Sequence, residues 1–204
     1  MSDLSDQLLL RAFCQGDRSA FDALYHRYAA RVHATAYRLT GNWEDAEDAL
    51  QEVFVRLAHK AGTIRNGMGL SSFIYRMTVN CATDCIRRRR ASVSLDQSQS
   101  ASAEVIAVES VRREKEKEAS TERETLLSRI EALVPNLPER QAAVFVLRSF
   151  QGLSHREIAG ILGFAETSSK SHYSLACGKL REWVKARDEE ECAKDEMKKG
   201  VCKD

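Results

Sequence analysis

Three carboxylates and an amide are closely spaced in one short stretch of the chain. Asp45, Asp48 and Glu52 stand three and four positions apart, so in a helix they share one face. Gln51 adjoins them. An acidic face with a neighbouring amide can pair with basic residues on a partner helix and steer its docking. The spacing alone leaves a second interpretation open, the solvated flank of an ordinary helix.

A run of four arginines, Arg87–Arg90, offers the opposite charge. Beside a nucleic acid, such a run binds phosphates. Without one, it is the solvated end of a helix.

A helix-turn-helix is predicted in the last third of the chain. Ser154 followed by Glu157 is a capping-box pattern, Gly163 ends that helix after about two turns, and a last helix runs from about Glu166 to Arg187. In such a motif the second helix enters the major groove, and its N-terminal residues reach base edges.

The surface of that second helix carries short polar side chains, a histidine and one lysine: Thr167, Ser168, Lys170, Ser171, His172 and Ser174. This mixture suits both reading of bases and contact with the DNA backbone. The alternative is an ordinary solvated helix pair.

Signatures of enzymes are missing from the sequence. GxxxxGK[ST], GxGxxG, GxSxG and HExxH are all absent. We therefore expect a protein that is not an enzyme, with no catalytic residue and no cofactor.

The cysteines stand at positions 14, 81, 85, 177, 192 and 202, with no CxxC pair. We expect free thiols, with Cys81 facing the core, and no metal site. Metal or redox sensing by Cys177, Cys192 or Cys202 is the alternative.

Charge is unevenly distributed, although the 204 residues sum to only +1. The net charges are +3 over residues 1–90, −3 over 91–127, +4 over 128–187 and −3 over 188–204. The alternation predicts two polyanion-facing modules joined by an acidic connector.

Apolar stripes at helical spacing recur over residues 21–32, 46–57, 70–81 and 126–134. Residues 91–125 are first Ser-rich and then dense in charge, which is typical of a linker. The fold class expected is all-α, with two small helical domains joined by a flexible acidic linker. The expected parts are an N-terminal helical bundle (1–90), the linker (91–125), a helix-turn-helix domain (126–187) and a charged tail (188–204).

No apolar stretch is long enough to span a membrane. The first ten residues carry Asp3 and Asp6 and no basic segment, so no secretory signal is expected. We therefore expect a cytoplasmic protein.

Several of these stretches resemble motifs of one family. DAEDALQEVF at 45–54 resembles the polymerase-binding segment of bacterial sigma factors, and LPERQ at 137–141, with GLS at 152–154 and EIA at 157–159, resembles their C-terminal helix-turn-helix. The stretches 15–28 and 73–80 fit the same family. The predicted arrangement, two small domains with no others, is similar to that of the extracytoplasmic-function group, whose members act in stress responses.

The resemblance implies a role in transcription initiation, with core RNA polymerase and promoter DNA as partners. Asp45, Asp48, Gln51 and Glu52 fall where the family meets the clamp helices of the largest polymerase subunit. The loop at 62–69 and the following helix match the part that reads the minus-ten element and takes up a flipped base.

Within that part, the resemblance assigns a role to each polar or aromatic position. Ile64, Arg65 and Asn66 would line the base pocket, and Asn80 would contact the base edge. Phe73 would be either a base-stacking wedge or a core residue. Arg76 and Arg87, Arg88, Arg89 and Arg90 would bind phosphates.

The second domain would read the minus-thirty-five element, with Arg148 on a phosphate ahead of the recognition helix. The sequence departs from the family's pattern here, because Ser169 stands where a buried Val is usual and His172, Leu175 and Cys177 stand where Arg is common. Fewer arginines predict weaker DNA binding by this domain.

The group is commonly held inactive by an anti-sigma factor, so such a partner is expected. The acidic linker either follows the polymerase's RNA path or is a simple tether. Two other functions remain open: a stand-alone helix-turn-helix repressor or activator, and a protein-interaction module that binds no DNA. The promoter sequence and the inducing signal are not specified by these residues.

Overall fold

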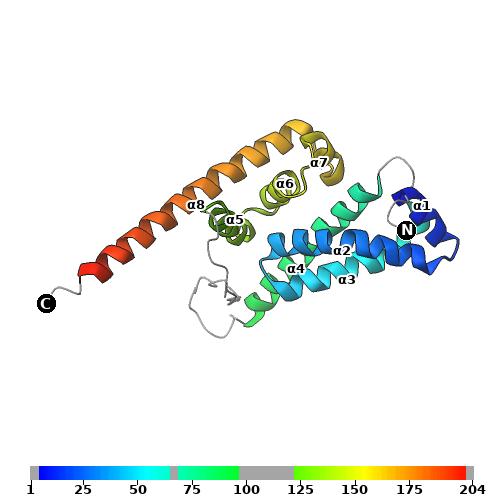
Figure 1. Ribbon diagram of the computed structural model, residues 1–204, viewed down its shortest axis with the longest axis horizontal. Helices are drawn as coiled ribbons and strands as arrows, with labels where there is room; N and C mark the ends of the chain where they lie inside the picture. The colour runs from blue at the N-terminus through cyan, green and yellow to red at the C-terminus, as the bar shows by residue number, and fades with distance from the viewer. Residues whose placement is uncertain (1–4, 65–68, 97–121, 201–204) are drawn as a thin grey trace.

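The structure, a computed structural model, describes residues 5–64, 69–96 and 122–200. Within these ranges the regular elements are α-helices and short 3-10 turns, which confirms the expected all-α class. Most of the predicted linker, residues 97–121, lies outside the described residues. Figure 1 shows a helical bundle and, beside it, a second group of helices that ends in one long helix.

The first unit consists of four helices: α1 (Asp6–Cys14), α2 (Arg18–Thr40), α3 (Trp43–Lys60) and α4 (Leu70–Asp96), with the short turn η1 (Ala61–Thr63) after α3. Helices α2, α3 and α4 pack against one another. Their shared core is fully buried and includes Leu24, Val53 and Ile74, which lie on the predicted apolar stripes. Cys81 is buried in the same core, as expected.

Hydrogen bonds of Asp6 hold α1 against α2. The Asp6 carboxylate accepts hydrogen bonds from the Arg27 guanidinium at 2.5 Å and from the Tyr28 hydroxyl. Burial and this carboxylate raise the pKa of Tyr28 above its usual range, so the phenol stays a donor. Helix α1 forms one wall of a surface hollow that Ile64 also lines, so Asp6 helps to position that wall.

The second unit contains α5 (Glu122–Leu133), the turn η3 (Val134–Asn136), α6 (Glu139–Ser149), α7 (His155–Leu162) and α8 (Glu166–Gly200). The capping box at Ser154 and Glu157 is present, and Gly163 ends α7 in the left-handed conformation, as predicted. Helix α8 continues to Gly200, past the expected end at Arg187. The added residues include four Glu and three Lys, which favour helix.

The two units lie against each other. Helix α2 contacts η3 and α6, and α4 contacts α7. The units also approach each other closely at Gly41, which ends α2 with a φ of 65°; a Cβ atom there would lie 2.8 Å from Cγ of Pro135. Only glycine fits this position, because a side chain would be strained and would also strike the second unit.

We predict that Gly41→Ala destabilises the protein more than Gly163→Ala does. Gly163 shares the positive φ but faces open space, so its substitution costs only backbone strain of about 1–2 kcal/mol. Gly41→Ala adds the collision with Pro135, for an expected extra loss of at least about 1 kcal/mol. Urea unfolding followed by circular dichroism measures both, and equal losses would show that the units do not meet at Gly41.

Candidate functional site

The acidic stretch lies on α3, and its carboxylates differ in burial and in the residues that they bind. Asp45 is the most buried of the three carboxylates and forms an ion pair with Arg89 of α4 at 2.8 Å. Glu52 pairs with Arg56 one turn along α3 at 2.5 Å. Asp48 is exposed, as is Gln51. Asp45 therefore braces α3 against α4, while the other positions remain open to a partner.

The open part of this face borders on the arginines of α4. Asp48, Gln51 and Glu52 line a surface hollow of about 650 Å³ together with Arg87 and Arg88. An exposed apolar side chain, Val55, continues the face by one turn. Sequence reasoning missed Val55, although its spacing of four from Gln51 places it on the same face.

Two cysteines form the floor of that hollow. Burial raises the pKa of Cys81 to about 11 and also raises the pKa of Cys85, whose sulfur receives a contact from the Arg88 guanidinium at 3.1 Å. Both thiols are therefore protonated at neutral pH, which makes them poor nucleophiles and poor metal ligands. Among the described residues, no group of three or more His, Cys, Asp or Glu side chains is placed to hold a metal ion.

The arginine run of α4 is largely engaged within the chain. Arg87 donates to both carboxylate oxygens of Glu139, at 3.3 and 2.8 Å. Arg89 binds Asp45 and also donates to the backbone oxygen of Thr40. The sequence predicted that these arginines bind phosphates. In the structure, carboxylates of this chain already bind two of them, Arg87 and Arg89.

Earlier on α4, Arg76 reaches into the second unit. Its guanidinium donates to the backbone oxygens of Ile161 at 2.5 Å and Gly160 at 2.8 Å. Phe73, one turn before it, is half-buried and packs against the core.

Asn80 is exposed and lies in a hollow of about 510 Å³ between α4 and the second unit. The other walls include Arg56, Arg140 and Phe164. Ile64 lies elsewhere, so the structure does not place Ile64 and Asn80 in one pocket. Arg65 and Asn66, the two other predicted pocket residues, lie outside the described residues.

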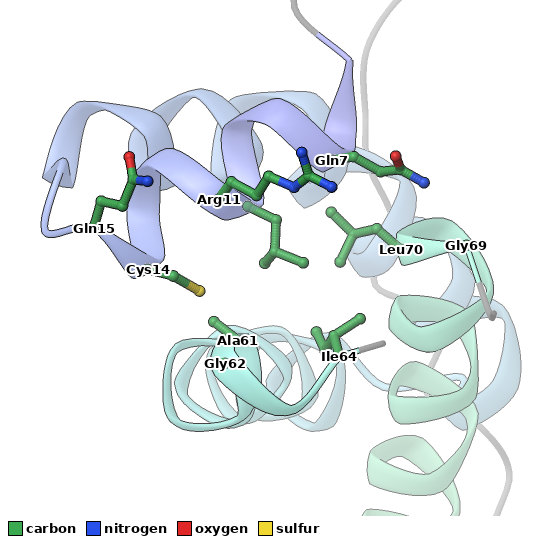
Figure 2. Close-up of a pocket in the computed structure, with 10 residues that line it drawn as sticks. Gln7, Arg11, Cys14, Gln15, Ala61, Gly62, Ile64, Gly69 and Leu70 are labelled. Carbon is green, nitrogen blue, oxygen red and sulfur yellow. The ribbon is translucent and has the colours of Figure 1, made fainter. Parts of the chain in front are cut away.

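Ile64 lines a hollow of about 330 Å³ at the start of α4 (Figure 2). Figure 2 shows Ala61, Gly62 and Ile64 facing the residues of α1 across the hollow, with Leu70 entering from the start of α4 beside Gln7. The α1 wall supplies Gln7, Arg11, Cys14 and Gln15, which sequence reasoning missed. Gln7, Arg11 and Gln15 repeat every four residues, a spacing that could have marked them as one face of a helix.

The helix-turn-helix presents most of its predicted reading positions to solvent. Thr167, Lys170, Ser171 and Ser174 are exposed on α8, and Ser168 and His172 are half-buried. Lys170 pairs with Glu166 at 2.8 Å. Arg148 donates to the backbone oxygen of Leu153 at 2.9 Å and so holds the turn before α7.

The structure gives a physical reason for a serine at position 169. It is fully buried, as the apolar residue usual at this place would be, and its hydroxyl lies 3.0 Å from Nδ1 of His155. The hydrogen bond satisfies a hydroxyl that burial would otherwise leave unpaired. His155 and Ser169 therefore join α7 to α8 by a polar contact.

His155 is held neutral by its surroundings. Its pKa is lowered by desolvation and then by the positive charges of Arg148 and Lys170, against a smaller opposite effect of Glu166. A neutral imidazole can accept or donate at Nδ1, so it suits the contact with Ser169.

Two family models match the chain. The model of sigma-70 region 2 matches residues 24–92, which include the acidic face of α3 and the arginines of α4. The model of sigma-70, region 4 matches residues 127–180, which include the helix-turn-helix.

Relatives of known identity match over most of the chain. The ECF RNA polymerase sigma factor SigM of Mycobacterium tuberculosis is 33% identical over 176 residues, covering 86% of this chain and 83% of its own. SigW of Bacillus subtilis, also an ECF RNA polymerase sigma factor, is 26% identical and covers 84% of this chain and 92% of its own.

Solved structures share the fold. CnrH, in complex with the cytosolic domain of CnrY, has a TM-score of 0.64 at 21% identity, with 89% of this chain and 97% of that chain covered. RpoE of Bartonella quintana, in complex with the anti-sigma factor NepR, has a TM-score of 0.62 at 21% identity, with 81% of this chain and 96% of that chain covered.

No described helix is long and apolar enough to cross a membrane.

We predict that acid destabilises the protein partly through His155. Because its folded pKa lies below the unfolded value of about 6.5, the unfolded state binds more protons as the pH falls through that value, and stability is lost. His155→Gln keeps a polar partner for Ser169 and cannot titrate. Thermal unfolding between pH 7.5 and 5 should show a shallower loss for His155→Gln than for the wild type.

The exposed His59→Gln is the matched control, and its loss should parallel that of the wild type. If His155→Gln and the wild type lost stability equally, His155 would not be the titrating group.

Proposed function

Since the chain belongs to the extracytoplasmic-function group of RNA polymerase sigma factors, which are transcription initiation factors, we propose that it docks on core polymerase through α3 and contacts promoter DNA through α4 and α8. The proposed parts are the region 2 domain at 1–90, the linker at 91–125, the region 4 domain at 126–187 and the tail at 188–204. The protein would act with polymerase in the cytoplasm and would catalyse no reaction of its own.

The observation that carries this proposal is the exposed acidic turn of α3. Asp48 and Gln51 are open to solvent, and Glu52 is half-exposed beside them. They lie inside the stretch that matches sigma-70 region 2. A partner helix that carries basic residues would find a rigid row of acceptors there, which favours fast and oriented docking. Asp45, paired with Arg89, is better suited to holding α3 in place.

Promoter opening is proposed for the surface of α4 and the segment before it. Asn80 is exposed, and its amide both donates and accepts, so it can contact the edge of an unstacked base. The hollow at Ile64 has an apolar floor and the polar ends of Gln7 and Arg11 at its rim, which suits a second nucleotide. Arg76 and Arg87–Arg90 would bind phosphates when their present partners release them.

Recognition of the minus-thirty-five element is proposed for α8. Thr167, Lys170, Ser171 and Ser174 lie exposed at its N-terminal end, where a recognition helix meets base edges. The only cation among them is paired with Glu166, so we expect a shallow salt dependence for this contact.

An anti-sigma factor is the proposed inhibitory partner. RpoE of Bartonella quintana, whose fold this chain shares, was solved with the anti-sigma factor NepR. A stand-alone helix-turn-helix regulator is not favoured, because the region 2 match and the acidic face would then have no role.

We predict that Asp48→Lys weakens binding to core polymerase by at least about tenfold, because reversal of a charge in a complementary interface replaces attraction by repulsion. Asp22→Lys, at an exposed position of α2, is the matched control. Surface plasmon resonance with immobilised core polymerase measures both. Equal affinities for Asp48→Lys and Asp22→Lys would remove the docking role from α3.

Asn80→Ala should impair promoter opening while leaving polymerase binding unchanged. The substitution removes the amide from an exposed position and leaves the helix intact. Opening is followed by permanganate reactivity of unpaired thymines in the holoenzyme complex, with core affinity measured in parallel. Open complexes formed equally well by Asn80→Ala and the wild type would exclude Asn80 from base contact.

A further inference from the structure

A cluster of aromatic rings lies where α2 ends and α3 begins. The side chain of Trp43 is 53% exposed, although burial of its large ring would be favourable. The centre of that ring lies 4.3 Å from the ring of His33 and 6.2 Å from the ring of Tyr37, both on α2. Tyr37 is itself 41% exposed. These three residues form an aromatic corner. Single exposed apolar side chains are ordinary, but clustered exposed rings are typical of a surface that contacts a partner.

The aromatic corner is held firmly in place. Asn42 caps α3, because its side chain accepts a backbone hydrogen bond at 2.9 Å, and so fixes the turn that carries Trp43. The half-buried ring of His33 supports the indole from α2. The second unit approaches at Gly41, yet Trp43 and Tyr37 stay exposed. A preorganised aromatic group loses little conformational freedom when a partner covers it.

A ridge on α3 connects the aromatic corner to the acidic face. Four exposed side chains at intervals of four residues form this ridge: Trp43, Glu47, Gln51 and Val55. Four residues turn a helix by about 40° beyond a full circle, so the α3 ridge crosses the exposed side of the helix diagonally, over about 18 Å. It begins beside α2 and ends at the hollow that Val55 lines together with Asp48 and Glu52. Rows of residues four apart are the ridges against which a second helix packs.

The α3 ridge has apolar ends and an acidic middle. Val55 is 51% exposed, nearly as much as Trp43 at the other end. Between them lie the carboxylate of Glu47 and the amide of Gln51, with Asp48 adjoining. A helix that packs along this ridge would match it with basic side chains at its centre and an apolar recess opposite Trp43.

We propose that Trp43 is the main anchor of the polymerase-docking surface, and that the aromatic corner and the α3 ridge together bind one basic helix of core polymerase. The inference rests on the proposed function for the identity of the partner, and on exposure, spacing and charge for the contact. Trp and Tyr are enriched among the few residues that carry most of the binding energy of an interface, whereas charges at its rim mainly steer the approach. Burial of Trp43 therefore slows dissociation, and Asp48 speeds association.

Surface plasmon resonance with immobilised core polymerase tests the anchor in the full-length chain. The variants are Trp43→Ala, Tyr37→Ala and the conservative Trp43→Phe, each checked for folding by circular dichroism. Leu8→Ala is the matched control, because Leu8 is 50% exposed but lies on α1, which packs near the start of α2, whereas Trp43 follows its end (Figure 1). Asp48→Lys is measured beside them, and every variant is measured at about 0.1 M and about 0.5 M salt.

We expect Trp43→Ala to bind core polymerase at least about tenfold more weakly than Leu8→Ala, chiefly through faster dissociation. Trp43→Phe should recover part of the loss, and Tyr37→Ala should lose about three- to tenfold. The loss in Trp43→Ala should be equal at both salt concentrations, because the missing contact is apolar. The loss in Asp48→Lys should shrink at high salt, because screening weakens the repulsion between like charges.

Equal affinities for Trp43→Ala and Leu8→Ala, with Asp48→Lys weakened, would overturn the anchor and leave the proposed function standing. Polymerase binding that neither Trp43→Ala nor Asp48→Lys alters would overturn both the anchor and the docking role of α3.

A second copy of this chain is the other occupant that the aromatic corner could take. Analytical ultracentrifugation of the chain alone, as wild type and as Trp43→Ala, distinguishes it. A monomeric wild type is the result expected, and a wild-type dimer that Trp43→Ala abolishes would overturn the assignment to polymerase.

Discussion

The structure depends on one kind of interaction, in which guanidinium groups along α4 bind acceptors on other helices. Arg76 finds them at the end of α7, Arg87 at Glu139 and Arg89 at Asp45. DNA phosphates would satisfy the same groups equally well. Because one guanidinium cannot hold both sets of acceptors at once, phosphate binding by Arg76 and Arg87 would require that their contacts with the second unit break.

The acidic face of α3 depends on the same kind of interaction. Asp45 neutralises Arg89 and fixes α3 on α4, and this leaves the neighbouring turn around Asp48 presented rigidly to a partner. The surfaces proposed for polymerase docking and for DNA contact thus lie on adjacent helices of one bundle.

The elements were predictable because their signals are local. The capping box at Ser154, the end of α7 at Gly163 and the stripe that buries Cys81 each depend on residues a few positions apart. Contacts across the two units were not predictable, since Arg76 and Ile161 are separated by 85 residues. The sequence identifies Ser169 only as a departure from the family's pattern, and the structure shows the His155 imidazole with which its hydroxyl pairs.

In vitro transcription tests whether this chain directs core polymerase to promoters. Purified chain and bacterial core RNA polymerase would be incubated with a library of promoter fragments, and the transcripts would be sequenced. The account predicts transcripts that start at a shared promoter sequence and that require both components. Failure to bind core polymerase, together with duplex binding by the chain alone, would contradict it and would identify a stand-alone DNA-binding regulator.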